Sequence, residues 1–355
     1  MPDDAPALPT LIPKVVSGDP LTVEEAEAAF TAVMEGRASP VQITALLVGL
    51  RAHGESPVHV AGGVRALRIA MIPVQSPHGW HVVDTCGTGG GAFLTFNIST
   101  AAALLAAGAG ARIAKHGNRS FTSRCGSADV LAALDVPIEL TPEQMTAVFQ
   151  QAGIVFMFAP LLHPAMRHVA PVRRELGMPT IMNLLGPLTN PASARRQVVG
   201  VSHPRLLELV AGALRELGHE HALVVHGNPG MDEISPIGTT DVIEVRGGNL
   251  DRYTLDPAEY FDAASLDPND LRGGDPDYNA RVINEVLRGE LGGAARAAVV
   301  LNAGAALFVA GIAKSIREGI TAANAALDGG KGAAALDQLR ATTRAVLAQP
   351  ALSAD

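Results

Sequence analysis

From Trp80 onward, short runs of apolar and β-branched residues alternate with longer segments of helical pattern. The runs predict strands at 81–83, 113–114, 154–158, 198–201, 222–225 and 242–245. Helices are expected between and after them, among others at 204–217, 279–288, 295–312 and 331–348. Strands that alternate with helices form a mostly parallel sheet covered on both faces. The chain after Trp80 therefore predicts a large α/β domain.

The first 75 residues are helical in pattern instead. Thr22, Ser39 and Ser56 each stand where a helix N-cap is expected, and Pro73 closes the segment. The apolar residues of this segment exceed what three short helices can bury among themselves, so a partner surface on a second subunit is expected. These residues are Phe30, Val33, Ile43, Leu46, Leu47 and Leu50.

The stretch 161–190 is predicted to return to this helical segment. It contains four prolines and the basic residues Arg167, Arg173 and Arg174. The expected division is a small helical domain of 1–75 plus about 161–190, and an α/β domain of 76–160 plus 191–355. A chain that leaves a small domain and comes back makes a hinge, with a cleft between the domains.

Charge is distributed unevenly along the sequence. The whole chain has 27 Lys and Arg against 35 Asp and Glu, a net charge of −8, which argues against a nucleic-acid binder. None of the 44 residues from 85 to 128 is acidic, yet four are basic. They are Arg112, Lys115, Arg119 and Arg124. A cationic pocket in an acidic protein suits a small anionic ligand, although a chance gap in acid content would look the same.

A glycine-rich loop at 87–91 lies in this window, between a predicted strand and a helix that begins near Ser99. Glycines let backbone N–H groups approach an anion, and a helix N-terminus adds donors. The loop predicts a phosphate site, to which Asn97, Ser99 and Thr100 add side-chain donors. It lacks the Gly-Lys-Ser/Thr of a Walker A loop, and the acid that a dinucleotide fingerprint needs about 20 residues later is missing.

The run Lys-His-Gly-Asn-Arg-Ser at 115–120 leaves the end of a predicted strand, where ligands bind in open α/β sheets. Lys115 and Arg119 suit phosphate oxygens, and Asn118 can orient a polar substrate group. His116 is either a catalytic base or a hydrogen-bonded structural histidine.

Two adjacent carboxylates, Asp232 and Glu233, follow the strand predicted at 222–225. Alone, such a pair is usually solvated. Opposite a phosphate pocket it predicts Mg²⁺, which proteins commonly bind through one or two carboxylates plus phosphate oxygens. The run 183–191 resembles a turn when taken alone, and His163 and His168 are interpreted as structural.

Cys86 and Cys125 are the only cysteines, which excludes a disulfide scaffold and a cysteine zinc site. The N-terminus has no basic-then-apolar signal pattern, and polar or charged residues interrupt every long apolar stretch. A cytoplasmic protein that does not enter a membrane is expected.

Together, these motifs resemble anthranilate phosphoribosyltransferase, in that family's order and across most of the chain. The resemblance rests on Gly87-Thr88-Gly89-Gly90, 96–100, 115–119, 126–129, 183–191 and Asp232-Glu233. The run 183–191, Asn-Leu-Leu-Gly-Pro-Leu-Thr-Asn-Pro, favours this family over its fold relatives, the pyrimidine nucleoside phosphorylases. The resemblance implies an α/β fold of the nucleoside phosphorylase and phosphoribosyltransferase type, with a hinge to a small helical domain.

The resemblance also implies a homodimer that transfers the phosphoribosyl group of phosphoribosyl pyrophosphate (PRPP) to the amine of anthranilate in tryptophan biosynthesis. It implies PRPP contacts at Gly87, Gly90, Gly91, Thr95, Asn97, Ile98, Ser99, Thr100, Lys115, His116, Gly117, Asn118, Arg119, Ser120, Phe121, Thr122, Ser123 and Ser127. Mg²⁺ would be bound by Ser99, Asp232 and Glu233. Anthranilate would contact Gly87, Asn118 and Arg173, and would enter past Gly186 and Pro187. The residues expected to act in catalysis are Lys115, Arg119 and Asn118.

Two positions depart from the family pattern. Gly91 stands where Asp is usual, which puts the handling of the metal in question, and Met182 replaces a usual Phe, which is interpreted as a packing exchange. Two alternatives remain open. A nucleoside phosphorylase-like enzyme would cleave a nucleoside with phosphate and ignore PRPP, whereas a non-catalytic nucleic-acid-binding relative should have a broad basic surface.

Overall fold

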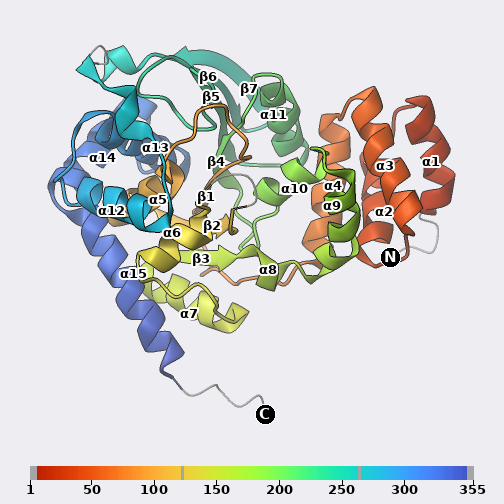
Figure 1. Cartoon of the computed structure of the whole chain (residues 1–355), viewed down its shortest axis with the longest axis horizontal. Helices are drawn as coiled ribbons and strands as arrows, with labels where there is room; N and C mark the ends of the chain where they lie inside the picture. Colours follow the sequence, from red (N-terminus) through yellow and green to blue (C-terminus); the bar gives the residue numbers. More distant parts are fainter. Residues whose placement is uncertain (1–5, 121–123, 263–264, 350–355) are drawn as a thin grey trace.

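In the computed structural model, which describes residues 6–120, 124–262 and 265–349, a seven-stranded sheet forms the centre of the larger part of the chain (Figure 1). In spatial order its strands are β3 (Ile154–Phe158), β2 (Arg112–Gly117), β1 (Val82–Gly87), β4 (Arg196–Gly200), β5 (His221–Gly227), β6 (Thr240–Arg246) and β7 (Asn249–Leu255). The strands from β3 to β5 are parallel, whereas β6 and β7 are antiparallel. The predicted mostly parallel sheet is confirmed.

The strand order reverses beside β1, because β2 pairs with one edge of β1 and β4 with the other. In open α/β sheets, the crevice beyond the carboxyl ends of the strands at such a reversal is where ligands bind. Here β1 ends at Gly87, β2 at Gly117 and β4 at Gly200. The loops singled out in the sequence begin at this edge.

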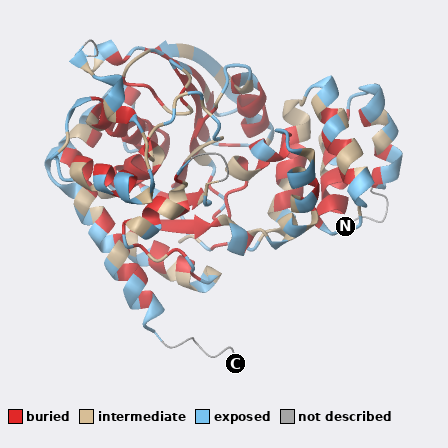
Figure 2. Cartoon of the chain, in the orientation of Figure 1, coloured by how far each residue is buried: buried red, intermediate tan, exposed pale blue. Residues whose placement is uncertain are grey.

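Helices cover both faces of the sheet, because successive strand residues point to opposite sides. Leu223 and Val225 of β5 join a core with the helices of one face, whereas Ala222 and Val224 join a second core with α11 (Leu206–Glu216). The helices of the first core are α5 (Ile98–Gly108), α6 (Ser127–Ala133), α7 (Pro142–Ala152), α12 (Pro276–Leu287), α13 (Gly293–Ala310), α14 (Ile316–Asp328) and α15 (Lys331–Leu347). The buried strands between these layers are visible in Figure 2.

The strand β7 and the helix α14 are absent from the sequence prediction. β7 is an edge strand whose residues are mostly exposed, so it lacks the apolar run by which the other strands were found. Gly247 and Gly248, with φ of 56° and 85°, connect β6 to β7. Two glycines with positive φ are typical of a tight hairpin turn. The Gly-Gly pair in the sequence could therefore have predicted the hairpin that leads into β7.

The N-terminal unit contains α1 (Leu8–Ser17), α2 (Val23–Met34), α3 (Pro40–His53) and α4 (Pro57–Ala70). The caps predicted at Thr22, Ser39 and Ser56 are confirmed, since each side chain accepts a hydrogen bond from the N–H three residues later. α1 was not predicted as a separate helix, because it has no side-chain cap and contains Pro13.

The prediction that the apolar residues of this unit need a partner surface is wrong. All six of these residues are buried within the single chain. Phe30 is 1% exposed and Leu46 is 0% exposed. α1 packs on α3, and segments from later in the chain cover the rest of the unit. These six residues therefore do not require a second subunit for their burial.

Those later segments are the short 3₁₀ helix η1 (Pro164–His168), α9 (Ala170–Leu176), α10 (Met182–Leu188) and α11, which packs on α4, whereas α8 (Ala159–Leu162) contacts β3. Of these, η1 packs against α2, α9 against α3 and α10 against α4. The run 183–191 is not simply a turn as expected, because its first part lies in α10, which tolerates Pro187 in its last turn. The division of the chain into two domains at the predicted boundaries stays a prediction.

Helix α13 is long and apolar enough to cross a membrane if only length and composition are considered. However, 89% of it is buried inside the fold, where it packs against α5, α14 and the sheet. It is the central helix of the larger core.

Candidate active site

A cavity of about 400 Å³ opens beyond the carboxyl ends of β1 and β2, where the strand order reverses. Most of the predicted site residues line it, although they come from segments that are far apart in the sequence. They are Gly87, Gly90, Gly91, Thr95, Asn97, Ser99, Lys115, His116, Gly117, Asn118, Arg119, Ser120, Ser127, Gly186, Pro187, Asp232 and Glu233.

Three predicted residues do not line this cavity. Ile98 and Thr100 are buried in the first turn of α5, and Arg173 lies on α9 of the helical unit. Burial lowers the pKa of Arg173. Phe121, Thr122 and Ser123 lie outside the described residues. The roles of all six stay predictions.

The glycine loop lies directly against the acidic loop that follows β5. Gly89 and Gly90 have φ of 71° and 78°, and the N–H of Gly89 donates to Oδ2 of Asp232 at 2.9 Å. A Cβ at Gly87 would lie 2.3 Å from the same oxygen, and a Cβ at Gly200 would collide with the backbone of Asp232. Glycine at 87 and 200 therefore lets Asp232 reach the cavity.

Gly91, one of the two departures from the pattern that the sequence resembles, also faces this acidic loop. A Cβ there would lie 3.0 Å from the carbonyl oxygen of Gly230 and 3.2 Å from Oδ1 of Asp232. The N–H of Phe93 donates to the same carbonyl, at 3.3 Å. The atoms nearest to position 91 thus belong to the acidic loop.

The first turn of α5 directs backbone donors at the acidic pair. The N–H of Ser99 donates to Oε1 of Glu233 at 3.2 Å. Asn97 occupies the N-cap position, but its side chain makes no capping bond. The hydroxyl of Thr100 is buried, lines a separate small void and has no hydrogen-bond partner among the described residues. Of the three side-chain donors predicted here, Ser99 is therefore the one placed at the cavity with its hydroxyl.

Lys115 reaches the cavity from beneath. Its Nζ donates to the carbonyl of Thr85 at 2.5 Å and to Oγ of Ser99 at 3.2 Å, and the residue is 4% exposed. Burial lowers the pKa of Lys115, whereas the negative charge of Asp84 opposes this effect. The ammonium is held between the end of β1 and the first turn of α5.

Asp84 and Asn190 form a buried junction under the cavity. Nδ2 of Asn190 donates to Oδ2 of Asp84 at 2.7 Å and to the carbonyl of Ala114 at 2.8 Å. Asp84 Oδ1 accepts from the N–H of His116. Burial raises the pKa of Asp84 to about 6. The end of the run 183–191 is thereby tied to β1 and β2.

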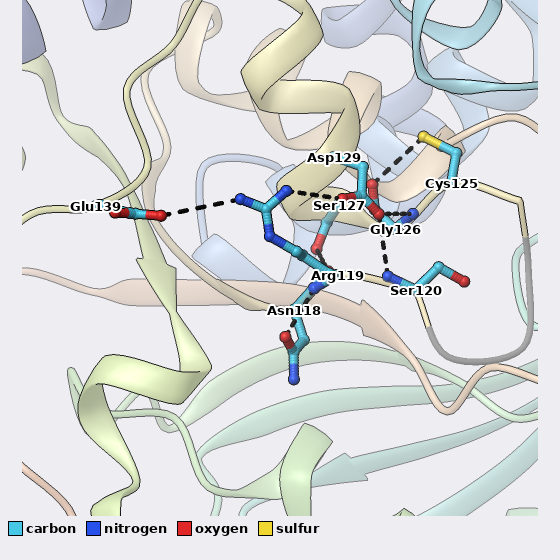
Figure 3. A network of polar contacts seen from close by, with 8 residues as sticks. All are labelled: Asn118, Arg119, Ser120, Cys125, Gly126, Ser127, Asp129 and Glu139. Atoms are coloured by element: carbon cyan, nitrogen blue, oxygen red, sulfur yellow. Dashed lines mark hydrogen bonds and ion pairs between the residues drawn. The ribbon is translucent and has the colours of Figure 1, made fainter.

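The loop after β2 is held by Asp129, as Figure 3 shows. Its carboxylate accepts hydrogen bonds from the N–H of Ser120 (3.0 Å), the N–H of Gly126 (2.9 Å) and Nη1 of Arg119 (3.1 Å). Partial burial would raise the pKa of Asp129, but these three donors outweigh it and lower the pKa. Arg119 also faces Glu139, at 3.9 Å.

Asp232 and Glu233 are partly buried carboxylates in the wall of the cavity. Burial raises the pKa of Asp232, and burial together with the charge of Asp232 raises the pKa of Glu233 to about 8. No group of three or more His, Cys, Asp or Glu suited to a metal occurs within 6–120, 124–262 and 265–349. Two carboxylates beside Ser99 suit an Mg²⁺ ion that takes its other ligands from substrate oxygens.

The four basic residues of the acid-free window do not converge. Lys115 and Arg119 line the cavity, whereas Arg112 stands at the opposite end of β2, with its guanidinium 4.3 Å from the ring centre of Trp80. Arg124 is exposed and outside the lining. Two of the four basic side chains of this window therefore line the cavity, which Asp232 and Glu233 also line.

His116 contacts His163, which precedes η1. Their Nε2 atoms lie 3.2 Å apart. Burial lowers the pKa of His116 to about 3 and that of His163 to about 4, so both rings are neutral near pH 7. A neutral pair of this kind agrees better with the structural interpretation of His116 than with a strong base.

Several residues that support the site were missed. Asn302 of α13 binds both backbone groups of Ile234, the residue after Glu233, and Asn279 of α12 binds Asn97. Both are buried polar residues in apolar surroundings, which is a signal that such a group has a specific partner. The partner itself is set by the fold, over 68 and 182 residues of sequence separation.

Comparison with known proteins gives consistent matches. Residues 79–333 match the family model described as glycosyl transferase family, a/b domain, and residues 9–71 match the helical bundle domain of that family. A protein of Rubrobacter xylanophilus named anthranilate phosphoribosyltransferase is 54% identical over 331 residues, which cover 93% of this chain and 96% of that protein.

Solved structures agree in fold. Anthranilate phosphoribosyltransferase from Thermus thermophilus superposes with a TM-score of 0.87 at 43% identity, covering 94% of this chain and 99% of that one. The Saccharomyces cerevisiae enzyme in complex with PRPP and Mg gives 0.84 at 24% identity, covering 95% and 98%.

Proposed function

Because this chain belongs to the anthranilate phosphoribosyltransferase family, we propose that its cavity is the catalytic site of that reaction. The chain transfers the phosphoribosyl group of PRPP to the amine of anthranilate, giving N-(5-phosphoribosyl)anthranilate and pyrophosphate in tryptophan biosynthesis. The observation that carries the site assignment is the convergence of three features: a glycine loop, a helix N-terminus with Lys115, and the pair Asp232 and Glu233.

PRPP binds, in this proposal, between the two loops that follow β1 and β2. Backbone N–H groups of the glycine loop and of the first turn of α5 face the pyrophosphate, with Lys115 and Arg119 adding positive charge. Arg119 exchanges its weak contact with the exposed Glu139 for a phosphate oxygen while it keeps Asp129. Asp232, Glu233 and Ser99 would hold Mg²⁺, which supplies charge neutralisation on the leaving group when bound.

Anthranilate is proposed to bind at Gly87 and Asn118, with Gly186 and Pro187 at its entry. Arg173 then pairs with its carboxylate, and this requires the helical unit to close toward the cavity. Closure would align the two substrates and exclude the water that otherwise hydrolyses PRPP.

The reaction needs no strong base at its start, because the aromatic amine is already neutral and nucleophilic. The C1–N bond forms as the C1–O bond to pyrophosphate breaks, and the amine then loses a proton. Negative charge grows on the departing pyrophosphate. Lys115, Arg119 and the loop N–H groups are aimed at that charge and stabilise it.

We also propose that the protein is a cytoplasmic homodimer. The helical unit carries exposed apolar side chains, with Val41 on α3 at 78% exposure and Val16 on α1 at 57%. Light scattering coupled to gel filtration measures the mass of the protein in solution. A mass equal to that of one chain would refute the proposed homodimer.

The loss of anthranilate fluorescence in the presence of PRPP and Mg²⁺ tests the function directly. Phosphate and a pyrimidine nucleoside in place of these substrates should give no turnover. Arg173→Ala should raise the KM for anthranilate about 10- to 100-fold and leave that for PRPP nearly unchanged, as expected for a lost charge-assisted pair. Arg174→Ala, next to it on α9, is the matched control. Equal effects of Arg173→Ala on both substrates would discard the anthranilate assignment.

A further inference from the structure

A chain of three hydrogen bonds connects helix α12 to the two loops that face the cavity. The N–H of Gly274 donates to Oδ1 of Asn279 at 2.8 Å, and Nδ2 of Asn279 donates to Oδ1 of Asn97 at 2.9 Å. Nδ2 of Asn97 then donates to the carbonyl of Cys125 at 3.2 Å. Asn279 is 2% exposed and does not line the cavity.

The direction of this chain is fixed at both ends. A backbone N–H can only donate, so the Asn279 atom next to Gly274 is an oxygen. A backbone carbonyl can only accept, so the Asn97 atom next to Cys125 is a nitrogen. Neither amide can be turned over without breaking a bond, which removes the ambiguity that asparagine side chains usually carry.

Asn97 stands at the N-cap of α5, where an asparagine normally accepts a hydrogen bond from its own helix. It makes no such bond here, because Asn279 and Cys125 occupy its amide. The N–H groups of the first turn of α5 have other partners: that of Ser99 donates to Oε1 of Glu233 beside the cavity, and that of Thr100 donates to the carbonyl of Asn97. The other end of the chain holds Cys125, two residues before Ser127, which also lines the cavity.

We propose that Asn279 is a positioning residue for PRPP, which fixes the spacing between the start of α5 and the segment that leads into Ser127. The inference rests on the proposed function, since it assigns the phosphate-facing loops to PRPP. Asn279 touches neither substrate. It acts through Asn97, whose amide spans the gap between the two loops.

Asn284 lies on the same helix but does not take part in this chain of hydrogen bonds. Its Nδ2 donates to the carbonyl of Ala280 in its own helix, at 3.0 Å. Asn284→Asp is therefore a matched control, with the same chemical change on the same helix and no link to the cavity.

Asn279→Asp keeps the size of the side chain and removes its donor. One carboxylate oxygen still accepts from Gly274, but the other faces Oδ1 of Asn97, so two acceptors meet. If Asn97 turns over to relieve this contact, its oxygen faces the carbonyl of Cys125. One link of the chain is lost in either arrangement.

Steady-state kinetics should show the KM for PRPP raised about 10-fold in Asn279→Asp, since one buried hydrogen bond is lost. The KM for anthranilate should be unchanged, and Asn284→Asp should behave like the wild type. Protonation of the carboxyl group introduced by Asn279→Asp gives it an O–H that can again donate to Asn97. The ratio of variant to wild-type KM should therefore fall from pH 8 to pH 6. In an Asn97→Ala background, the additional effect of Asn279→Asp should vanish.

Hydrogen–deuterium exchange of the ligand-free protein tests the same chain without a substrate. Peptides that cover 97–105 and 124–130 should exchange faster in Asn279→Asp than in the wild type and in Asn284→Asp. Unchanged exchange in these peptides, an equal rise of KM for both substrates, or additive effects with Asn97→Ala would each overturn the role of Asn279. A wild-type enzyme that does not consume PRPP would instead refute the proposed function, and the exchange result would still decide the role of Asn279.

Discussion

The two loops that face the cavity are each held by a carboxylate, and the two carboxylates are in opposite situations. Asp129 accepts hydrogen bonds from Ser120, Gly126 and Arg119, which together lower its pKa. Asp232 accepts from the N–H of Gly89 beside a second acid, Glu233, and burial raises its pKa.

This difference separates a structural acid from a functional one. A carboxylate with three donors is stable as an anion, because its charge is already compensated. A buried carboxylate with too few donors is unstable as an anion until a cation arrives. Asp129 therefore holds Ser120 and Gly126 without a ligand, whereas Asp232 beside Glu233 agrees with the proposal that this pair takes up a metal.

The largest effect is expected from removing the functional acids. Asp232→Asn combined with Glu233→Gln should lower turnover by about 1,000-fold or more, because the charge that is proposed to hold Mg²⁺ is removed while the size of both side chains is kept. Circular dichroism and thermal melting should show a fold at least as stable as the wild type. Activity close to that of the wild type at limiting Mg²⁺ would show that the pair has no metal role.

Removing the structural acid should act mainly through the shape of its loop. Asp129→Asn can keep its oxygen against the N–H groups of Ser120 and Gly126, which share Oδ2, but its NH₂ group then faces the guanidinium of Arg119. The lost charge and the two opposed donors should destabilise the protein by about 1–3 kcal/mol and raise the KM for PRPP about 10-fold. Glu139→Gln is the control, since its contact with Arg119 is long and exposed and is worth about 0–1 kcal/mol. Equal melting temperatures for Asp129→Asn and Glu139→Gln would erase the distinction between the two kinds of acid.

A smaller effect is expected when an acid is added to the glycine loop. Gly91→Asp would place a carboxylate next to Asp232, and the repulsion between them should make PRPP binding depend more steeply on Mg²⁺. If the repulsion amounts to about 1 kcal/mol, the half-saturating concentration of Mg²⁺ should shift about fivefold. Gly91→Asn has the same size without the charge. Superimposable Mg²⁺ titrations of these two variants would mean that only the tight space at position 91 matters.

The smallest effect concerns how stability responds to pH in the presence of a chelator and without substrate. The lowered pKa of Asp129 means that its contribution is present above the pKa of the unfolded chain and is lost as pH falls. The deficit of Asp129→Asn should therefore shrink toward pH 4. The raised pKa of Asp232 means that its ionisation destabilises the fold as pH rises, so Asp232→Asn should gain stability with pH. Differences of about 2 °C in melting temperature are expected, and differences of the same sign would refute this contrast.

The sequence predicted the parts of the site that act through local pattern. The glycine loop, Lys115 and the acidic pair each follow a recognisable strand, and parallel strands bring their ends to one edge of the sheet. Arg112 was wrongly assigned to the cavity because basic residues were counted over a stretch of sequence, without regard to which end of a strand each one occupies. It begins β2 three residues before Lys115, and at about 3.3 Å per residue the two lie roughly 10 Å apart along the strand.

The supporting residues could not be predicted in the same way. Asn190, Asn279 and Asn302 are buried amides whose partners depend on how the helices lie across the sheet. The burial of Phe30 and Leu46 was misjudged although the return of 161–190 to the helical unit was predicted, because local pattern does not give how much surface η1, α9, α10 and α11 cover. Local pattern identifies what a residue can do, whereas the chain topology decides what it meets.

The separation of 143 residues between Gly89 and Asp232 has a consequence for how the protein is made. At about 5–20 residues per second, the ribosome completes the glycine loop roughly 7–30 s before it adds the acid that this loop binds. Asn279 follows later still, 182 residues after Asn97. The nascent chain therefore carries the glycine loop and Asn97 well before it holds Asp232 and Asn279, whereas Asp129, which accepts from Arg119, is only 10 residues further along the chain.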